Sequence, residues 1–286
     1  MNNYLTIKEF SKLSGIEQTT LRYWDDIGLF SPTRRNPENN YRYYSPQQII
    51  SVNFITVLSE LNIPLKTIGE FDKGRTPEKI ERLLAGKEMQ LDNEMRKLRE
   101  RYSIIHTRRE LINYGLRLQK GFSVINGEMI DDPEEGLWVD ANEIAVLQRE
   151  AKAFILGPRN HWKHGDSFFE YFMDFCKSAD ELRVNLSFPI GAYHDDMESF
   201  LKAPGEPDYF CSIDPTGNRK MAAGKYLVGY SRGFYGDFGD LNERMKAYSE
   251  EKKLKLHGPV YTIYLHDEIC ITDPDQYLAQ VSVAVL

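Results

Sequence analysis

The most informative part of this sequence is residues 15–44, which read GIEQTTLRYWDDIGLFSPTRRNPENNYRYY. Before it, Thr6 and Glu9 have the spacing of a capping box, in which each side chain satisfies a backbone amide at a helix start. The helix that they open ends at Gly15, a residue suited to the positive φ of a tight turn. Apolar residues three positions apart then predict the buried face of a second short helix. Two such helices predict a helix-turn-helix, whose second helix can enter a DNA major groove.

A tight loop and an extended aromatic segment complete this part of the chain. Residues 32–40 contain two Pro, three Asn and two Arg, which is the composition of turns. Residues 41–44 combine three Tyr with one Arg, and such a segment can hold a phosphate between a guanidinium and flat phenols. Ser45 and Gln48, with Pro46 between them, predict the start of the next helix.

In these residues the chain resembles the winged helix-turn-helix of the MerR family of transcriptional regulators. The family pattern is Leu-Arg-Tyr-Tyr, Gly-Leu and Tyr/Phe-Arg-x-Tyr, and it matches residues 21–24, 28–29 and 41–44. One departure is Trp24, where Tyr is usual. The resemblance implies that residues 1–75 bind double-stranded promoter DNA. The residues expected to contact DNA are Gln18, Thr19, Arg22, Tyr23, Tyr41, Arg42, Tyr43 and Lys66.

The formal net charge of −7 is unevenly distributed along the chain. Residues 1–75 contain 9 Lys/Arg and 8 Asp/Glu (+1), residues 76–120 contain 11 and 7 (+4), and residues 121–286 contain 16 and 28 (−12). The acidity of the whole chain argues against nucleic-acid binding, but binding responds to a local patch. Because the local basic excess is small, we expect DNA affinity to need a dimer and two half-sites.

No membrane, secretion or metal signal stands out. The sequence has no run of about 18 apolar residues and no apolar segment of a signal peptide. The three cysteines, Cys176, Cys211 and Cys270, are an odd number without metal-ligand spacing, so we expect reduced thiols in a cytoplasmic protein. His161 and His164 have no third ligand near them in the sequence, and we expect neither a metal site nor a cofactor.

Residues 76–120 are predicted to form one long helix with Thr76 as its cap and Pro77 at its first position. Apolar residues recur every seven positions along it, as in a coiled coil, at Leu84, Leu91, Leu98, Ile105 and Ile112. The companion position is mixed and holds Glu88, Met95, Tyr102, Arg109 and Leu116. This pattern predicts a two-stranded seam and a homodimer, which the MerR resemblance implies to be antiparallel. The alternative is a helix that lies on its own C-terminal domain.

The rest of the chain has a repeated pattern. Residues 121–136 are acidic and turn-rich and predict a linker. Two passages then follow the order strand, helix, strand, at 143–156, 166–177 and 183–193, and again at 220–232, 238–250 and 259–266, with further strands at 209–213 and 277–285. This pattern predicts an α+β domain with an antiparallel sheet, helices on one face and the other face free.

This half of the chain resembles the GyrI-like effector-binding domain of multidrug-sensing MerR regulators. Residues 155–158, 223–226, 258–265 and 275–277 carry the resemblance. The fold class expected for the whole chain is therefore α+β. It consists of a winged helix-turn-helix at 1–75, a coiled-coil dimerisation helix at 76–120 and a GyrI-like domain at 121–286.

The C-terminal half has the composition of a site for lipophilic molecules. It holds 23 of the 35 aromatic residues, whose rings offer flat contact area and faces that attract cations. We expect the rings of one helix, Phe168, Phe169, Phe172 and Phe175, to be ordinary core. The residues expected to bind a hydrophobic aromatic or cationic effector are Trp162, Phe188, Tyr230, Phe234, Phe238, Thr262, Tyr264, Glu268 and Tyr277.

The charge of the ligand is left open by Thr262. In the multidrug-sensing relatives a Glu usually stands at this position and faces the ligand. Without this Glu, selectivity for a cation would depend on Asp267, Glu268 or the faces of aromatic rings. A neutral ligand is an alternative, as is an anionic one bound by Arg149, Arg183 or Arg232.

The expected function is a ligand-responsive transcriptional regulator. The MerR resemblance implies an activator that works with RNA polymerase and distorts the promoter spacer when its effector binds. The alternatives are a small-molecule hydrolase or ligand-sequestering protein that uses the C-terminal domain, and an architectural DNA-binding protein. No Ser-His-Asp set, Gly-x-Ser-x-Gly motif or paired-carboxylate site indicates catalysis, so we expect no enzyme and assign no catalytic residue.

Overall fold

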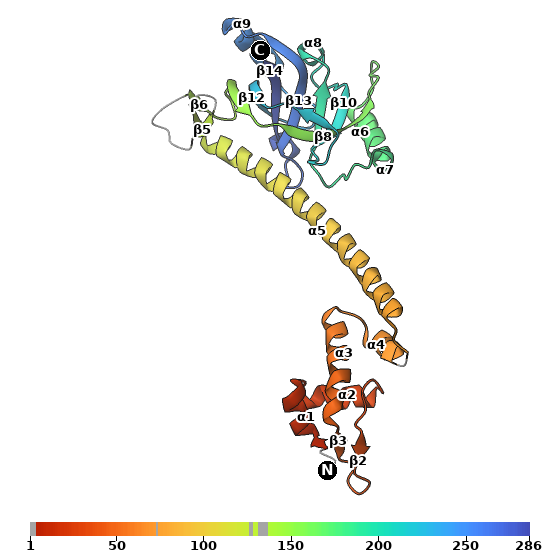
Figure 1. Cartoon of the computed structure of the whole chain (residues 1–286). Helices are drawn as coiled ribbons and strands as arrows, with labels where there is room; N and C mark the ends of the chain where they lie inside the picture. Colours follow the sequence, from red (N-terminus) through yellow and green to blue (C-terminus); the bar gives the residue numbers. More distant parts are fainter. Residues whose placement is uncertain (1–3, 73, 126–127, 131–136) are drawn as a thin grey trace. The chain divides into compact units, whose positions relative to one another are not determined.

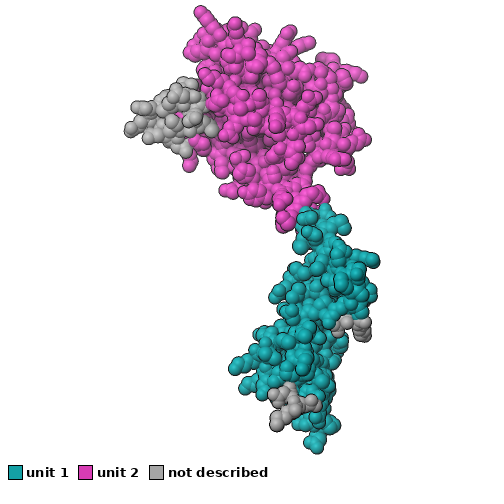
Figure 2. Space-filling model, viewed as in Figure 1, with its two compact units in different colours: residues 1–93 teal, residues 94–286 magenta. Residues whose placement is uncertain are grey.

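A computed structural model describes residues 4–72, 74–125, 128–130 and 137–286. The chain divides into two compact units, residues 1–93 and residues 94–286 (Figure 2). No helix in the described ranges is long and apolar enough to cross a membrane.

The first unit is a small helical domain with a three-stranded sheet. Its elements are β1 (Leu5–Thr6), α1 (Ile7–Ser14), α2 (Gln18–Asp26), β2 (Arg34–Arg35), β3 (Arg42–Tyr44), the 3₁₀ helix η1 (Pro46–Gln48), α3 (Ile49–Glu60) and α4 (Leu65–Asp72) (Figure 1). The sheet order is β1-β3-β2, with antiparallel pairing throughout. The expected helix-turn-helix and wing are therefore present.

The local signals of the sequence form these elements as expected. The Thr6 hydroxyl accepts a hydrogen bond from Glu9 N, and Glu9 Oε2 accepts one from Thr6 N. Gly15 has φ of 74°, which a residue with a Cβ rarely adopts. Inside the unit, the Phe10 and Tyr44 rings stack with centroids 4.7 Å apart, and Phe30 lies 5.7 Å from Tyr44. This aromatic stack joins α1 to the wing.

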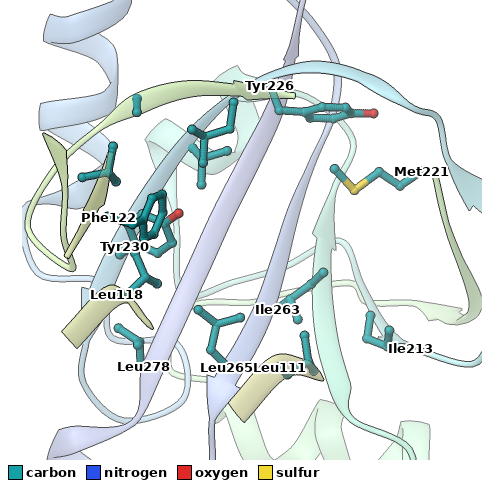
Figure 3. Packing of buried hydrophobic residues seen from close by; sticks show 14 of the residues in the cluster. Leu111, Leu118, Phe122, Ile213, Met221, Tyr226, Tyr230, Ile263, Leu265 and Leu278 are labelled. Carbon is teal, nitrogen blue, oxygen red and sulfur yellow. The ribbon is translucent and has the colours of Figure 1, made fainter. Parts of the chain in front are cut away.

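One long helix, α5 (Pro77–Lys120), contributes residues to both units. Its heptad positions Leu84, Leu91, Leu98 and Ile105 are exposed, and Ile112 is half-buried. A different side of its last turns, with Leu111 and Leu118, is buried within the second unit (Figure 3). Within one chain, then, the helix lies on its own C-terminal domain and also presents an unpaired apolar seam.

The second unit contains two sheets. A three-stranded sheet has the order β5-β4-β6, and an eight-stranded antiparallel sheet has the order β11-β8-β10-β9-β13-β14-β12-β7. The strands are β4 (Phe122–Ile125), β5 (Glu128–Ile130), β6 (Leu137–Val139), β7 (Ala145–Arg149), β8 (Lys152–Arg159), β9 (Ile190–His194), β10 (Tyr209–Ser212), β11 (Arg219–Met221), β12 (Gly224–Arg232), β13 (Leu256–His266) and β14 (Leu278–Val285). The helices are α6 (Phe168–Lys177), α7 (Ala179–Leu182), α8 (Met197–Lys202), α9 (Leu241–Glu251) and the 3₁₀ helix η2 (Pro274–Gln276).

The predicted linker at 121–136 is wrong in its described part. Residues 122–125 and 128–130 are strands β4 and β5, and Phe122 is fully buried. Strands of three or four residues are too short for the alternation of apolar and polar side chains to be recognised in an acidic segment. Residues 126–127 and 131–136 of the predicted linker lie outside the described residues.

The eight-stranded sheet curls so that strands that follow each other in the sequence lie toward opposite ends of its order. β7 and β8 are separated by two residues, yet β7 lies at one end of the sheet order and β8 is next to the other end. The pairing with β11 and β12 continues across the β7–β8 connection, from Gly224 opposite Arg149 to Met221 opposite Lys152. The single strand predicted at 143–156 is therefore two strands that serve opposite ends of the curled sheet.

The two strand–helix–strand repeats are confirmed, although some strands start at other residues than expected; β13 starts at Leu256, before the expected residue 259. The strand predicted from residue 183 starts only at Ile190, because residues 179–182 form a helical turn and Phe188 N closes a turn onto Asn185 O. Helices α6, α8 and α9 pack on one face of the sheet. The opposite face, expected to be free, is partly covered by the last turns of α5 (Figure 3).

Candidate functional site

The N-terminal unit presents a polar helix face made by α2. Arg22, Tyr23 and Thr19 are exposed, Gln18 is half-buried, and the Tyr23 ring has an exposed fraction of 54%. Leu21 and Trp24 point into the core, so the opposite side of α2 is free. Four of the residues expected to contact DNA thus share one helix surface.

A buried carboxylate holds the wing to this helix. The side chain of Asp25 is only 2% exposed, and its Oδ2 pairs with Arg35 and, at 2.5 Å, with Arg42 Nε. Arg42 Nη2 also lies 3.1 Å from Asp26 Oδ1. Arg42, expected to contact phosphate, thus already links β3 to α2 through these ion pairs. The sequence alone did not predict this role of Asp25, although Asp25 is four residues after Leu21 on the buried face of α2.

The exposed part of the wing includes aromatic and basic side chains beside Glu38 and several Asn. The rings of Tyr41 and Tyr43 lie 5.7 Å apart, and Tyr43 borders a shallow hollow with Arg34 and Asn36. Lys66 is exposed in the first turn of α4. These residues carry the hydroxyl, amide and cationic groups that DNA backbones bind.

The C-terminal unit contains a cavity of about 100 Å³, called here the aromatic cavity. It lies on the face of the sheet that α6, α8 and α9 cover. It is lined by residues of α5, α6, β9, β10, β13 and the loops beside them. The lining side chains are Arg108, Phe168, Phe169, Phe172, Leu186, Phe188, Ile190, Ala192, Phe210, Tyr235, Tyr264, Asp267 and Glu268, and Gly191 completes the wall. Because ligand pockets usually measure about 300–1,000 Å³, a drug-sized molecule must move some of these rings.

The walls of the aromatic cavity are mainly rings. Tyr235 is central: its ring lies 4.4 Å from Tyr264, 5.4 Å from Tyr277 and 6.2 Å from Phe168. The expectation that Phe168, Phe169 and Phe172 are ordinary core is wrong, since all three line the cavity. Only Phe175 is plain core, buried against Phe210. Helical periodicity identifies a buried face but not a gap left beside it.

The polar groups of the aromatic cavity give it a net negative charge. Glu268 accepts a hydrogen bond from the Tyr235 hydroxyl, and Tyr264 accepts one from Gly236 N at 3.0 Å. Burial raises the pKa of Tyr235 and of Tyr264, so both phenols stay neutral. With Asp267, Glu268 and Arg108 as the charged lining groups, the formal sum is −1.

Arg108 connects the aromatic cavity to α5. Its Nη1 pairs with Asp267 Oδ2 at 2.9 Å, and its Nε donates to Ser187 O at 2.8 Å. Ser187 precedes Phe188, so one guanidinium contacts both walls of the cavity. Nothing in the sequence marked Arg108, because the helix surface around it is rich in charged residues.

A second set of contacts fastens α5 near the same place. A Cβ at position 115 would lie 2.4 Å from His266 Nε2, so Gly115 allows the helix to approach closely. His266 Nε2 lies 3.2 Å from Ile112 O, and the Tyr114 hydroxyl is hydrogen-bonded to that of Tyr230. Asp267 directly follows His266. The end of β13 is therefore in direct contact with α5.

The residues expected to bind a ligand fall into three groups. Phe188, Tyr264 and Glu268 line the aromatic cavity. Phe234 and Tyr277 are not part of the cavity lining, but their rings pack against Tyr235. The other four residues do not line the cavity. They are Trp162, Tyr230, Phe238 and Thr262.

Each residue of the last group has a local role. Trp162 Nε1 donates to Pro207 O, and its ring lies 4.2 Å from Tyr171. Tyr230 is buried on the other face of the sheet, and Phe238 packs against Phe200. Thr262 is fully buried opposite Ala192, and its hydroxyl has no hydrogen-bond partner in the described part of the chain.

Metal-ligating side chains are not grouped in the described ranges. No set of three His, Cys, Asp or Glu side chains there is placed to hold a metal ion. The three cysteines are free thiols, and burial raises the pKa of Cys211 to about 12. A thiol with so high a pKa is a poor nucleophile or metal ligand at neutral pH.

Comparison with known proteins extends these observations. Residues 5–75 match the family model described as MerR HTH family regulatory protein. The chain is 26% identical over 290 residues to the multidrug-efflux transporter 2 regulator of Bacillus subtilis (strain 168), which covers 100% of this chain and 97% of that protein.

Two further relatives match parts of the chain. The multidrug-efflux transporter 1 regulator of Bacillus subtilis (strain 168) is 29% identical over 183 residues, 64% of this chain and 59% of that protein. The transcriptional regulator BrlR of Pseudomonas aeruginosa (strain PAO1) is 44% identical over 64 residues, 22% of this chain and 24% of that protein. The resemblance to multidrug-sensing MerR regulators is thereby confirmed.

Proposed function

We propose that this chain, whose residues 5–75 match the family model of MerR HTH regulatory proteins, is a ligand-responsive transcriptional regulator. It binds double-stranded promoter DNA as a homodimer and responds to a lipophilic molecule in the aromatic cavity. The observation that carries this proposal is Arg108, which joins the wall of the aromatic cavity to α5. A ligand that disturbs this contact acts directly on the helix that continues into the DNA-binding unit.

DNA binding uses α2 and the wing. Arg22 and Tyr23 are exposed on α2, and a helix of this kind can enter the major groove. Tyr41, Tyr43 and Lys66 supply phosphate contacts beside it. Arg42 supports them by holding the wing to Asp25, in addition to any contact of its own.

The dimer forms through the exposed seam of α5. Large apolar side chains such as Leu98, with an exposed fraction of 60%, and Ile105, with 59%, stand on a helix surface that its own domain leaves uncovered. A row of apolar residues at heptad spacing is buried by a second helix. A dimer also places two DNA-binding units on one site, which offsets the small basic excess of each unit.

The ligand is a lipophilic molecule, with a cation favoured over an anion. The aromatic cavity has a net charge of −1, and Glu268 at its edge is exposed. Ring faces and a nearby carboxylate both attract a cation. Because Thr262 carries no charge, this preference depends on Asp267 and Glu268.

Regulation works through the shape of the DNA. The dimer binds between promoter elements that are set too far apart, and effector binding distorts the spacer until RNA polymerase can engage both elements. Bending or untwisting a site costs about 1–6 kcal/mol. A ligand can supply a free energy of this size through its different affinities for two protein states.

The test of ligand binding uses a matched pair of small probes on the full chain. Benzyltrimethylammonium and the neutral 2,2-dimethyl-1-phenylpropane have the same shape and differ by one charge. We expect the cation to bind more tightly in calorimetry and Glu268→Gln to reduce that difference. Equal affinity of both probes would show that the carboxylates do not select the ligand.

The test of regulation uses DNA selected by the full chain from a random pool. We expect the cationic probe to leave DNA affinity nearly unchanged while it alters permanganate reactivity at the central base steps and raises transcript yield. Release of the protein from DNA by the probe, without central distortion, would contradict this mechanism.

A further inference from the structure

A second cavity of about 230 Å³, called here the tyrosine cavity, lies on the opposite face of the curled sheet. Ala192 and Tyr264 face the aromatic cavity. Tyr193 and Tyr261 stand at an odd spacing from them on the same strands, and side chains alternate between the two faces of a sheet. The two cavities are therefore separated by the sheet itself.

Four aromatic rings form the walls of the tyrosine cavity. Tyr261 lies 5.7 Å from Phe154 and 5.6 Å from Tyr193, and Tyr209 lies 5.6 Å from Tyr193. Their planes meet at 72°, 84° and 82° respectively. Rings at near right angles form a corner that offers both a face and an edge to a flat aromatic guest.

The hydroxyls of Tyr193 and Tyr261 are available to a ligand. Both rings are half-buried, yet neither hydroxyl makes a hydrogen bond within residues 4–72, 74–125, 128–130 and 137–286. Burial raises the pKa of both phenols, so each remains a donor at neutral pH. Two donors without acceptors favour a guest with an acceptor group.

The rim of the tyrosine cavity is positively charged in an otherwise acidic domain. Arg219 and Lys220 of β11 line it and are exposed, and neither forms an ion pair with any described residue. Asp195, the acidic lining residue, is already paired with Arg159 at 2.6 Å. The two cations therefore attract an anion, although residues 121–286 have a net charge of −12.

We propose that the tyrosine cavity is a second ligand site, which takes a planar aromatic anion such as an aromatic carboxylate. The ring lies in the corner made by Phe154, Tyr193 and Tyr261. The carboxylate faces Arg219 and Lys220 and accepts hydrogen bonds from the free phenols. This site is independent of the aromatic cavity and has the opposite charge preference.

The test is calorimetry of the full chain with 1-naphthoate and its uncharged methyl ester. We expect the anion to bind at least about tenfold more tightly, because charge-assisted hydrogen bonds exceed neutral ones. The double variant R219A/K220A should lose this advantage. The control K225A/K255A removes the same charge from exposed positions outside the cavity and should keep it. Equal loss in both double variants would reduce the effect to net charge and overturn the proposal.

Two single variants locate the bound ring. Tyr261→Phe keeps the ring and removes the hydroxyl, so we expect severalfold weaker naphthoate binding with unchanged thermal stability. Tyr235→Ala opens the aromatic cavity and should leave naphthoate affinity unchanged. Loss of naphthoate binding in Tyr235→Ala, together with normal binding in R219A/K220A, would assign the anion to the aromatic cavity and contradict a second site.

Discussion

Arg108 Nη1 lies 2.9 Å from Asp267 Oδ2, and this ion pair links the long helix α5 to the end of strand β13. The two side chains are largely buried, with exposed fractions of 19% and 11%. The same guanidinium binds Ser187 O in the loop before Phe188. A molecule that enters the aromatic cavity therefore meets Arg108, the one cationic side chain among the described residues that line it, and Arg108 belongs to α5.

Loss of this cation should destabilise the second unit. Arg108→Met keeps much of the side-chain volume but leaves Asp267 partly buried and unpaired, which costs about 2–4 kcal/mol. Urea unfolding should show this loss, and the double variant R108M/D267N should recover part of it. If the stability losses of the two single variants simply add in the double variant, the two groups do not interact. In transcription assays, we expect Arg108→Met to bind the cationic probe but to respond weakly to it.

Two arginines of the DNA-binding unit should behave differently. Arg22 is exposed, so Arg22→Ala should weaken DNA binding and lower the salt slope by about one. Arg42 is paired with Asp25 and Asp26, so Arg42→Ala should weaken DNA binding and also lower the thermal stability. Binding measured from low to high salt, beside melting curves, separates the two effects. Normal stability of Arg42→Ala would argue against a structural role of its ion pairs with Asp25 and Asp26.

A charge in the seam of α5 should separate the dimer. Leu98→Asp places a carboxylate at a heptad position with 60% exposure in the single chain, so the isolated domain should stay folded. Light scattering should then show a monomer, and footprinting should show loss of DNA protection. Lys97→Asp, on a neighbouring exposed position, is the control and should remain dimeric. A dimeric Leu98→Asp would place the contact elsewhere.

Thr262 should tolerate the loss of its hydroxyl. The group is fully buried without a partner in the described residues, so its burial is not compensated by a hydrogen bond. Thr262→Val has nearly the same shape and should raise the free energy of unfolding by about 1 kcal/mol. Urea unfolding measures this change. A lower stability would mean that a bound water or ligand group partners the hydroxyl.

The stability of the second unit should fall in mild acid because of His194. This side chain is fully buried, and burial lowers its pKa from 6.5 to about 4. The unfolded chain binds a proton near pH 6.5 and the folded chain only near pH 4. Acidification therefore favours unfolding across this range and should cost about 2 kcal/mol between pH 7.5 and 5. His194→Gln, neutral at every pH, should have a smaller loss; an identical loss would assign the acid sensitivity to other groups.

Local signals carried much of the architecture. The capping boxes at Thr6 and Ser45 and the turn at Gly15 are formed by residues within a few positions of one another, and the apolar repeat from Leu84 is a pattern along a single helix. Their physical effect depends on short-range geometry, which any fold of the chain must respect. For the same reason the helix-turn-helix, the long helix and the strand–helix–strand order could be predicted.

The site in the C-terminal unit depended on contacts between distant residues. Of the nine residues expected to bind a ligand, Phe188, Tyr264 and Glu268 line the aromatic cavity, but Arg108 and Tyr235 were not foreseen. Composition shows that aromatic rings are plentiful, yet it cannot tell a ring in a filled core from a ring beside a gap.

By itself, then, the sequence determined the helix-turn-helix, the apolar seam and the order of the strands, because periodicity and caps act over a few residues. Only the tertiary structure decided which rings surround a cavity and that Asp25 holds the wing. It also decided that Arg108 meets Asp267, 159 positions along the chain. Such pairs form when the curl of a sheet brings separate strands and one helix together, and no local pattern encodes that meeting.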